Sequence, residues 1–324
     1  MVDDALPAGV VGFGRVGAAL AGALAAVDHP VAAVAARSQA SRDRADIALP
    51  GVPVTTAVEV AKRAGLVFLT VPDSQIAPLA EDLAEHWRPG QLVVHAAGAM
   101  GLEVLEPVVR AGGIALALHP VMTFTGTSLD IARLQGAPFA VEAAPGLTPL
   151  AEALAIELGG RPFRLPAGAR PAYHAALSHA ANHLVTLLSQ ALDILEEAGI
   201  SAPETLIGPL TQAALDGALS RRLGALTGPA SRGDARTLRT HVEALEDYAA
   251  RRGALVGPEL ALDAAGAGAL DAVASYRQLA AATLRAAQRA GRIDSAQAAA
   301  GLESLAPQAP PAPPAPPGAQ SRDN

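Results

Sequence analysis

Short apolar runs alternate with amphipathic or alanine-rich segments from residue 9 to about residue 165. The segments between the runs are bounded by Gly, Pro, Asp and Ser. Short buried strands that alternate with helices form a mostly parallel sheet with helices on both faces. The pattern therefore predicts an N-terminal α/β domain built on a doubly wound, Rossmann-type sheet. The predicted strands are GVV (9–11), VAAVA (31–35), LVFLTV (66–71), LVVHA (92–96), IALAL (114–118), PFAVE (138–142) and PFRL (162–165).

The pattern changes after Pro166, where no further strand pattern occurs. One long helix is expected over residues 171–198, and further helices follow to about residue 303. The last residues are rich in Pro and Ala, which predicts an extended, disordered tail. The predicted parts are an N-terminal Rossmann domain (1–165), an all-α domain (166–303) and a tail (304–324), with helix breaks at 199–204, 226–234 and 255–260.

Composition narrows the class of function. The 324 residues carry a net charge of −7, so no overall basic field favours nucleic acid or an anionic membrane. No cysteine is present, which excludes disulfides, thiolate nucleophiles and cysteine-bound metal centres. The acidic N-terminus lacks the basic region of a signal peptide, and no apolar run reaches the roughly 18 residues of a spanning helix. We expect a cytoplasmic protein that binds a small molecule and has neither nucleic-acid nor membrane partners.

The stretch GVVGFGRVGAAL places Gly12, Gly14 and Gly17 in G-x-G-x-x-G spacing, directly after a predicted strand and at the start of a helix. In this context the first glycine permits a tight turn, the second admits a pyrophosphate, and the third lets the helix pack close to the sheet. The free N–H groups and the positive end of the helix dipole favour phosphate. We therefore predict dinucleotide binding by the whole loop, Gly12, Phe13, Gly14, Arg15, Val16 and Gly17.

The end of the second strand favours NADP over NAD. An NAD site usually has Asp or Glu there, which bonds the ribose 2′-hydroxyl. This chain has Arg37 and Ser38, with Arg42 behind them, and no carboxylate. A guanidinium and a hydroxyl suit the dianionic 2′-phosphate of NADP. The alternative is that Arg37 is an ordinary solvated loop residue.

Two later segments follow strands at the carboxyl edge of the predicted sheet, where ligands of such folds bind. In TVPDSQI (70–76), Val71, Pro72 and Asp73 are expected on the nicotinamide-ribose side. In HAAGAMG (95–101), Ala97 and Gly98 are expected to leave room for the ring and the substrate. We expect His95 to be a hydrogen-bonded strand-end residue rather than a catalyst.

The glycine loop, TVPDSQI, HAAGAMG, LHPVMTF (118–124), YHAALSHAANHL (173–184) and LTGPASRGD (226–234) occur in an order that resembles a known group. The chain resembles the bacterial family with a Rossmann-like domain followed by a helical domain of unknown function. That family is grouped with the 6-phosphogluconate and β-hydroxyacid dehydrogenases, ketopantoate reductases and pyrroline-5-carboxylate reductases. Its first domain is also similar to that of the F420-dependent NADP oxidoreductases. The resemblance extends to about residue 303.

The resemblance implies an oxidoreductase that transfers a hydride to or from NADP. It also implies a helical domain of the 6-phosphogluconate-dehydrogenase C-terminal type, a substrate held between the domains, and a homodimer formed through the helices. Similarity to alternative ketopantoate reductases makes 2-dehydropantoate the leading candidate substrate.

One residue of the resembled pattern is missing. Many of these enzymes carry Lys-x-x-x-Asn on the first long helix of the second domain, where the lysine exchanges the alcohol proton and the asparagine orients the substrate. Here Asn182 matches the asparagine, but Ser178 stands at the lysine position. Lys62 belongs to a helical region of the first domain, so we do not expect it to replace this lysine.

Helix geometry leaves two candidates for the proton donor. His174, Ser178 and Asn182 have i, i+4, i+8 spacing and share one face of the helix. His174 could donate directly or through Ser178, because imidazole titrates near neutral pH. His119, expected in the loop after the strand at 114–118, is an equal contender.

A second stripe on the same helix, His179 and His183, has the spacing of two metal ligands. It lacks the glutamate of a zincin helix and an obvious third ligand, so we predict no metal site. In LTGPASRGD we propose that Arg232 binds a substrate carboxylate, because its guanidinium can make bidentate bonds. An Arg232–Asp234 pair that caps the next helix explains the same residues equally well.

Together these features predict an NADP-dependent reductase of a small 2-keto acid. A cyclic imine reductase of the pyrroline-5-carboxylate reductase type is an alternative, because reduction of an iminium carbon needs no proton on an oxygen. A non-catalytic NADP-binding sensor or assembly protein is another, since the missing lysine permits lost chemistry.

Overall fold

The computed structural model describes residues 6–255 and 264–307. The chain divides between Asn182 and His183 into two compact units, which are described separately. We predicted the boundary at residue 165. The division comes later because the first turns of the long helix that begins at Arg170 contact the sheet of the first unit.

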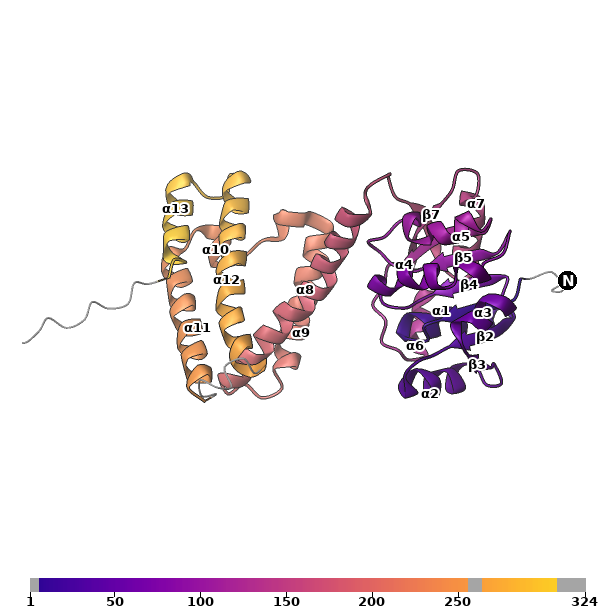
Figure 1. The fold of residues 1–324 in the computed structure, drawn as a ribbon. Coiled ribbons are helices and arrows are strands. Elements are labelled where there is room, and N and C mark those ends of the chain that lie inside the picture. Colours follow the sequence, from indigo (N-terminus) through magenta and orange to yellow (C-terminus); the bar gives the residue numbers. More distant parts are fainter. Residues whose placement is uncertain (1–5, 256–263, 308–324) are drawn as a thin grey trace, which may run out of the picture. The chain divides into compact units, whose positions relative to one another are not determined.

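The first unit contains a single sheet of eight strands in the order β3-β2-β1-β4-β5-β6-β7-β8 (Figure 1). All neighbours pair in parallel except β6 and β7, which are antiparallel. The strands are β1 (Ala8–Val11), β2 (Val31–Ala35), β3 (Val54–Thr55), β4 (Leu66–Leu69), β5 (Leu92–His95), β6 (Ile114–Pro120), β7 (Pro138–Ala143) and β8 (Arg161–Arg164).

Helices cover both faces of this sheet. The described helices of the first unit are α1 (Arg15–Ala26), α2 (Gln39–Ala48), α3 (Ala57–Arg63), α4 (Asp73–Asp82), α5 (Glu106–Arg110), α6 (Leu129–Leu134), α7 (Thr148–Glu157) and the first part of α8 (Arg170–Glu197), with 3₁₀ turns η1 (Ala84–His86) and η2 (Leu102–Leu105). Residues of α1, α2, α6 and α7 share one buried cluster with alternate strand positions, and residues of α3, α4 and α5 share the other.

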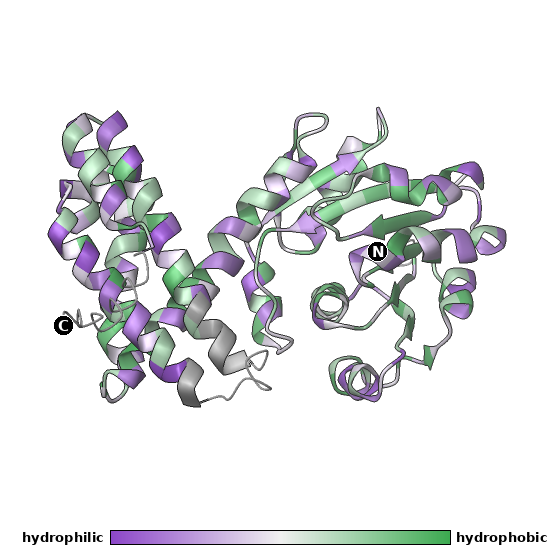
Figure 2. Ribbon diagram, turned by 60° about the vertical axis from the view of Figure 1, so that its left-hand side comes forward, coloured by the Kyte–Doolittle hydropathy of each residue, from purple (hydrophilic) through white to green (hydrophobic). Residues whose placement is uncertain are grey.

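Period-two alternation within the strands explains these two clusters. On β4, Leu66 and Phe68 lie in the first cluster, and Val67 and Leu69 lie in the second. A strand buried on both faces must be apolar at every position, which is why β4 has the sequence LVFL. The strands are correspondingly coloured largely as hydrophobic in Figure 2.

Seven strands were predicted from the sequence, and all seven are present. The strand β3 was missed because it has only two residues, Val54 and Thr55, and shows no apolar run. The expectation that His119 lies in a loop was wrong. β6 continues through Pro120, because His119 pairs with Ala140 in the antiparallel ladder to β7.

The second unit is helical in its described residues. It contains the rest of α8, then α9 (Pro203–Arg221), η3 (Arg222–Ala225), α10 (Pro229–Arg232), α11 (Ala235–Leu255), α12 (Ala264–Arg289) and α13 (Ser295–Ser304). A buried cluster joins α11, α12 and α13. The predicted breaks at 199–204 and 226–234 separate helices as expected, although the second contains the short α10.

Two further predictions concern residues outside the described ranges. The break at 255–260 falls there except for its first residue, and so does most of the tail, residues 308–324. Among the described residues, no helix has the length and apolar character needed to cross a membrane. The predicted fold class, a Rossmann-type sheet followed by a helical region, is confirmed by this architecture and by the domain match reported below.

Candidate active site

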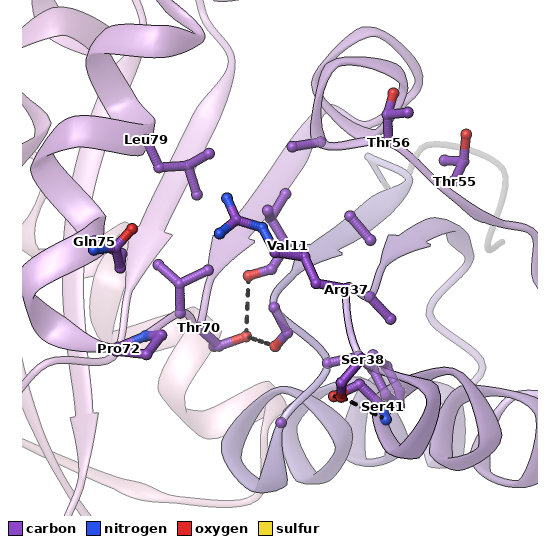
Figure 3. Close-up of a pocket in the computed structure, with 17 residues that line it drawn as sticks. Val11, Arg37, Ser38, Ser41, Thr55, Thr56, Thr70, Pro72, Gln75 and Leu79 are labelled. Atoms are coloured by element: carbon purple, nitrogen blue, oxygen red, sulfur yellow. Dashed lines mark hydrogen bonds between the residues drawn. The ribbon is translucent and has the colours of Figure 1, made fainter.

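A pocket of about 580 Å³ lies at the carboxyl ends of β1, β2 and β4 in the first unit (Figure 3). Parallel strands end at one edge of a sheet, and their loops form the usual ligand crevice of such folds. Seven of the residues predicted to bind cofactor line this pocket: Gly12, Phe13, Gly14, Arg37, Ser38, Val71 and Pro72.

The glycine loop has the geometry that its spacing predicts. Gly12 has a φ of +94°, which L side chains rarely adopt. A Cβ at Gly17 would lie 2.4 Å from the backbone oxygen of Gly12 and 2.6 Å from Oγ1 of Thr70. The Thr70 hydroxyl donates to that same Gly12 oxygen at 2.6 Å and so ties the loop to β4 (Figure 3).

Gly14 is different, because no heavy atom would lie within 4 Å of a Cβ placed there. Gly14 is the N-cap of α1, and no side chain caps the helix. The first N–H groups of α1 therefore remain available beside an open, glycine-lined surface. This donor set fits a diphosphate.

The remaining residues predicted in this region do not line the pocket. Arg15 is exposed at the start of α1, where its side chain approaches Gly126. Val16 packs against the core, and Gly17 makes the close contact described above. Asp73 is exposed as the first residue of α4.

Arg37 shares the lining of this pocket with Ser38 and Ser41. The backbone N–H of Ser41 donates to Oγ of Ser38, which thereby caps α2. The guanidinium of Arg42 donates to the backbone oxygen of Arg37 at 2.8 Å, which fixes the loop and leaves the Arg37 side chain pointing into the pocket (Figure 3). No Asp or Glu is among the described residues that line it.

Sequence reasoning missed several lining residues. They come from the first turn of α2, the unpredicted β3 with the start of α3, the end of β4, and α4: Ser41, Thr55, Thr56, Ala57, Thr70, Gln75 and Leu79. The pair Thr55-Thr56 was available as a signal, because Thr56 is an N-cap residue that opens α3.

The residues after β5 lie in the interior. The ring of His95 is fully buried, accepts the Ala97 N–H at Nδ1 (3.2 Å) and donates from Nε2 to the Gly101 oxygen (2.9 Å). Burial lowers the pKa of His95 to about 4, so the ring is neutral at pH 7. These contacts agree with the prediction of a hydrogen-bonded strand-end histidine.

Gly98 is where the two candidate histidines approach the backbone. A Cβ at Gly98 would lie 2.5 Å from Cδ2 of His174 and 2.8 Å from Nε2 of His119. The sequence led us to expect room for the nicotinamide ring and the substrate here. The structure instead shows two imidazoles packed against Gly98, with ring centroids 6.1 Å apart.

A second, smaller pocket of about 280 Å³ lies at the end of β6. Its lining includes all four predicted catalytic residues: His119 from β6, and His174, Ser178 and Asn182 from α8. The i, i+4, i+8 stripe therefore faces one cavity together with His119. The other lining residues are mainly apolar: Val121, Met122, Thr123, Leu177, Ala180 and Ala181.

Two residues behind this pocket were missed by sequence reasoning. Tyr173, adjacent to His174 in the sequence, has its hydroxyl 2.7 Å from Nδ1 of His119. Arg170 is 6% exposed, forms an ion pair with Glu142 and donates to the Ala97 oxygen at 3.3 Å. Tyr173 is the first residue of the segment YHAALSHAANHL, but it does not share the i, i+4 spacing of His174, Ser178 and Asn182.

Burial shifts the titration of both members of the His119–Tyr173 pair. Desolvation, aided by the nearby rings of His174 and His95 and the charge of Arg170, lowers the pKa of His119 to about 4. Burial raises the pKa of Tyr173 to about 12, partly opposed by Arg170. At pH 7, His119 is therefore neutral and Tyr173 is protonated.

Other predicted residues lie elsewhere. His179 does not line the small pocket, and His183 begins the second unit. Within the described ranges, no group of three or more His, Cys, Asp or Glu side chains is placed to hold a metal ion. Arg232 is exposed on α10 of the second unit. Asp234 caps α11 by accepting from the backbone N–H and hydroxyl of Thr237.

Comparison with known proteins identifies two domains. Residues 2–120 match the Rossmann-like domain, and residues 137–254 match a domain of unknown function, DUF2520. No curated protein matches the chain.

Several solved structures share the fold. A protein of Bacteroides fragilis, provisionally named an NADP oxidoreductase, has a TM-score of 0.69 at 22% identity over 88% of this chain and 100% of that one. A protein of Thermotoga maritima has a TM-score of 0.57 at 23% identity, with the same coverage. An imine reductase variant from Myxococcus stipitatus, in complex with NAD⁺, has a TM-score of 0.50 at 17% identity over 93% of this chain and 99% of that one.

At these identities the likeness concerns the fold. With a Rossmann-type sheet, a helical region and a match to each domain model, the chain is a Rossmann-like protein that carries a C-terminal DUF2520 domain.

Proposed function

We propose that this protein is an NADP-dependent reductase of a small 2-keto acid, with 2-dehydropantoate as the leading candidate. The observation that carries the proposal is the gathering of His119, His174, Ser178 and Asn182 around one small pocket. That pocket follows β6, whose carboxyl end lies at the same sheet edge as the ends of β1, β2 and β4 around the glycine-loop pocket. Polar groups that converge beside a nucleotide crevice are typical of a reductase site.

The larger pocket supports NADP as the cofactor, which would supply the hydride. Its glycine loop and the N-terminus of α1 would hold the diphosphate. Arg37, with the hydroxyls of Ser38 and Ser41, would hold a 2′-phosphate, since a charge-assisted bond to phosphate needs a cation and no competing carboxylate. The names given to the Bacteroides and Myxococcus proteins support a nicotinamide cofactor in this fold.

The Arg37→Ala variant tests the cofactor. We expect its affinity for NADPH to fall by about 10-fold or more, the effect of losing charged hydrogen bonds, while its affinity for NADH changes little. Arg63→Ala is the matched control, because Arg63 pairs with Glu59 on α3 and does not line the pocket. Equal losses for NADPH and NADH would exclude recognition of the 2′-phosphate by Arg37.

In the smaller pocket the chain's own residues would orient and protonate the substrate. Asn182 would bond the carbonyl or hydroxyl oxygen, and a histidine would supply the proton that lysine supplies in the resembled enzymes. Arg232, in the second unit, remains our proposed ligand for a substrate carboxylate. The apolar part of the lining, with Val121 and Leu177, suits a short aliphatic chain.

Turnover is tested by the loss of NADPH absorbance with 2-dehydropantoate, other 2-keto acids and cyclic imines. We expect keto-acid turnover that falls by at least about 10-fold in Asn182→Ala. His179→Ala, on the same helix but outside the pocket lining, is the control. If the protein binds NADPH but turns over none of these substrates, the proposed reductase function is wrong and the sensor or assembly role is favoured.

Reduction of a cyclic imine is the second candidate. The specific observation is that Ser178, not lysine, faces the pocket at the expected position. A protonated imine accepts a hydride at carbon without needing a proton on oxygen, so it tolerates this replacement. Turnover confined to cyclic imines would decide for this alternative.

We also propose that the protein is a homodimer formed through its helical unit. The 19-residue helix α9 buries only Pro203 and Gly217 among its residues, whereas Leu206, Leu210, Leu215 and Leu219 are exposed. Leu206 and Leu210, one turn apart, share one face of α9, and exposed apolar residues gathered on one helix face favour an interaction site. Leu210→Glu is expected to give a monomer in sedimentation analysis, whereas Ile47→Glu, at an exposed position of α2, is not. If Leu210→Glu sediments as a dimer, as we expect for Ile47→Glu, there is no interface on α9.

A further inference from the structure

The His119 ring is hydrogen-bonded to Tyr173. The two rings meet edge to face with centroids 5.6 Å apart, and the phenol oxygen lies 2.7 Å from Nδ1. His119 comes from β6 and Tyr173 from the first turn of α8, so this hydrogen bond joins the sheet to the helix that carries the candidate residues. Within the described ranges, neither the His119 nor the Tyr173 side chain makes another hydrogen bond.

The hydrogen bond determines which ring nitrogen carries the proton. The half-buried phenol is a better hydrogen-bond donor than acceptor, and Nδ1 is the acceptor within reach of its O–H, so we assign the O–H as the donor. The neutral imidazole then carries its proton on Nε2. The His119 ring lines the small pocket, whereas Tyr173, which lies against Nδ1, does not. Nε2 is therefore the ring nitrogen left to donate to a molecule in the pocket.

Arg170 provides the electrostatic support. Its guanidinium is buried, with Nε paired to Glu142 and Nη1 bonded to the Ala97 oxygen. Nη2 is buried and has no hydrogen-bond partner among the described residues. A buried cation with an unused donor stabilises any negative charge that forms nearby, and its charge acts on both Tyr173 and His119.

We propose that His119, fixed as the Nε2–H tautomer by Tyr173, is the proton donor that replaces the missing lysine. The inference rests on the proposed function. As the hydride adds to the carbonyl carbon, the π electron pair moves to oxygen, and the Nε2 proton passes to that oxygen. The Tyr173 hydroxyl proton passes to Nδ1, which leaves a neutral ring with its proton on the other nitrogen. The Nδ1 proton then returns to the phenolate, and Nε2 takes a proton from water, which leaves hydroxide and restores the first tautomer.

This relay explains how a neutral histidine can act as an acid. Neutral imidazole is a poor acid by itself, but proton entry at Nδ1 accompanies proton loss at Nε2. The acid consumed is then the phenol of Tyr173, whose anion is a much weaker base than an alkoxide. His119 touches the substrate and is the catalytic residue, whereas Tyr173 acts through it as a positioning residue. His174, packed against the same glycine, has no such hydrogen-bond partner among the residues that the structure describes.

The tautomer can be measured without turnover. In protein labelled with ¹⁵N-histidine, side-chain nitrogen shifts should show His119 protonated at Nε2 and bare at Nδ1 around pH 7, with the signal assigned by its loss in His119→Asn. Tyr173→Phe should give a mixture of tautomers. Tyr276→Phe is the matched control, because it removes an equivalent hydroxyl, 2.6 Å from Nδ1 of His241 in the second unit. A His119 ring protonated at Nδ1, or unchanged in Tyr173→Phe, overturns the proposal.

Kinetics test the relay itself. With a keto-acid substrate, Tyr173→Phe should lower kcat by about 10-fold to 100-fold while the KM for substrate and NADPH stays within about threefold. Tyr276→Phe should leave both constants unchanged. If Tyr173→Phe fails to fold, His119→Gln, which keeps a donor near Nε2 but no acceptor near Nδ1, should show the same loss of kcat. A normal kcat in these variants overturns the relay but not the proposed reductase function. An inactive wild type that shows the expected tautomer overturns the proposed function.

Discussion

Acidification from pH 7 to pH 5 is expected to weaken the first unit through two histidines, the buried His95 and the partly buried His119. Burial lowers the pKa of each to about 4, from 6.5 in the unfolded chain. Between these values the unfolded chain binds a proton that the folded chain does not bind. The two neutral rings therefore contribute fully to the free energy of unfolding above pH 6.5. This contribution falls as the pH drops from 6.5 to 4 and changes no further below pH 4.

The size of the effect follows from the two pKa values. Proton binding by the unfolded state lowers the free energy of unfolding by about 2 kcal/mol per histidine between pH 7 and pH 5. Two such rings give a loss of about 3–4 kcal/mol, which is a large fraction of the roughly 5–15 kcal/mol that stabilises an ordinary domain. Most carboxylates titrate below this range, so the window isolates the histidines.

Urea unfolding at the two pH values measures this loss. Trp87 is the single tryptophan and is buried in the first unit, so its fluorescence follows the unfolding of that unit alone. In His119→Asn the loss between pH 7 and pH 5 should shrink by about half. His86→Asn, on the 3₁₀ turn η1, should keep the full loss. Equal stability of the wild type at both pH values, or an unchanged loss in His119→Asn, would refute the reasoning.

Three substitutions separate packing from binding in the first unit. Gly17→Ala should lower stability by about 2 kcal/mol, because its Cβ would meet the Gly12 oxygen and the Thr70 hydroxyl; thermal unfolding checks this, and an unchanged Tm would contradict it. Gly14→Ala should unfold at the wild-type temperature, because its Cβ meets only the open pocket. It should bind NADPH about 10-fold more weakly, and normal binding in a titration would mean that the diphosphate binds elsewhere. Asp130→Ala should lower the free energy of unfolding in urea by about 2–3 kcal/mol, because the buried carboxylate accepts three hydrogen bonds from the preceding loop. A loss below about 1 kcal/mol would show that water replaces these hydrogen bonds.

The sequence was most informative where local physics dictates the outcome. Buried parallel strands need continuous apolar runs, so seven strands could be predicted, and only the two-residue β3 escaped. The glycine loop could be predicted because a tight turn and a close helix contact exclude side chains at Gly12 and Gly17. The spacing of His174, Ser178 and Asn182 is a property of one helix, and these residues do line one pocket.

The partners of these residues depend on contacts between distant segments. Tyr173 and His119 are 54 positions apart, and Arg170 and Glu142 are 28 apart, so no periodicity links them. The register of β6 against β7 places His119 on a strand instead of in a loop. Gly98 looked like space left for a ligand, and only the packed structure shows imidazoles there.

The sequence by itself therefore determined the fold class, the geometry of the glycine loop and the face of α8 that carries the candidate residues, because each is set by spacing within a single segment. The tertiary structure alone decided which phenol lies against Nδ1 of His119, where Arg170 is buried and where the first unit ends. These properties depend on burial and on side chains brought together by the sheet, and neither is encoded at any one position along the chain.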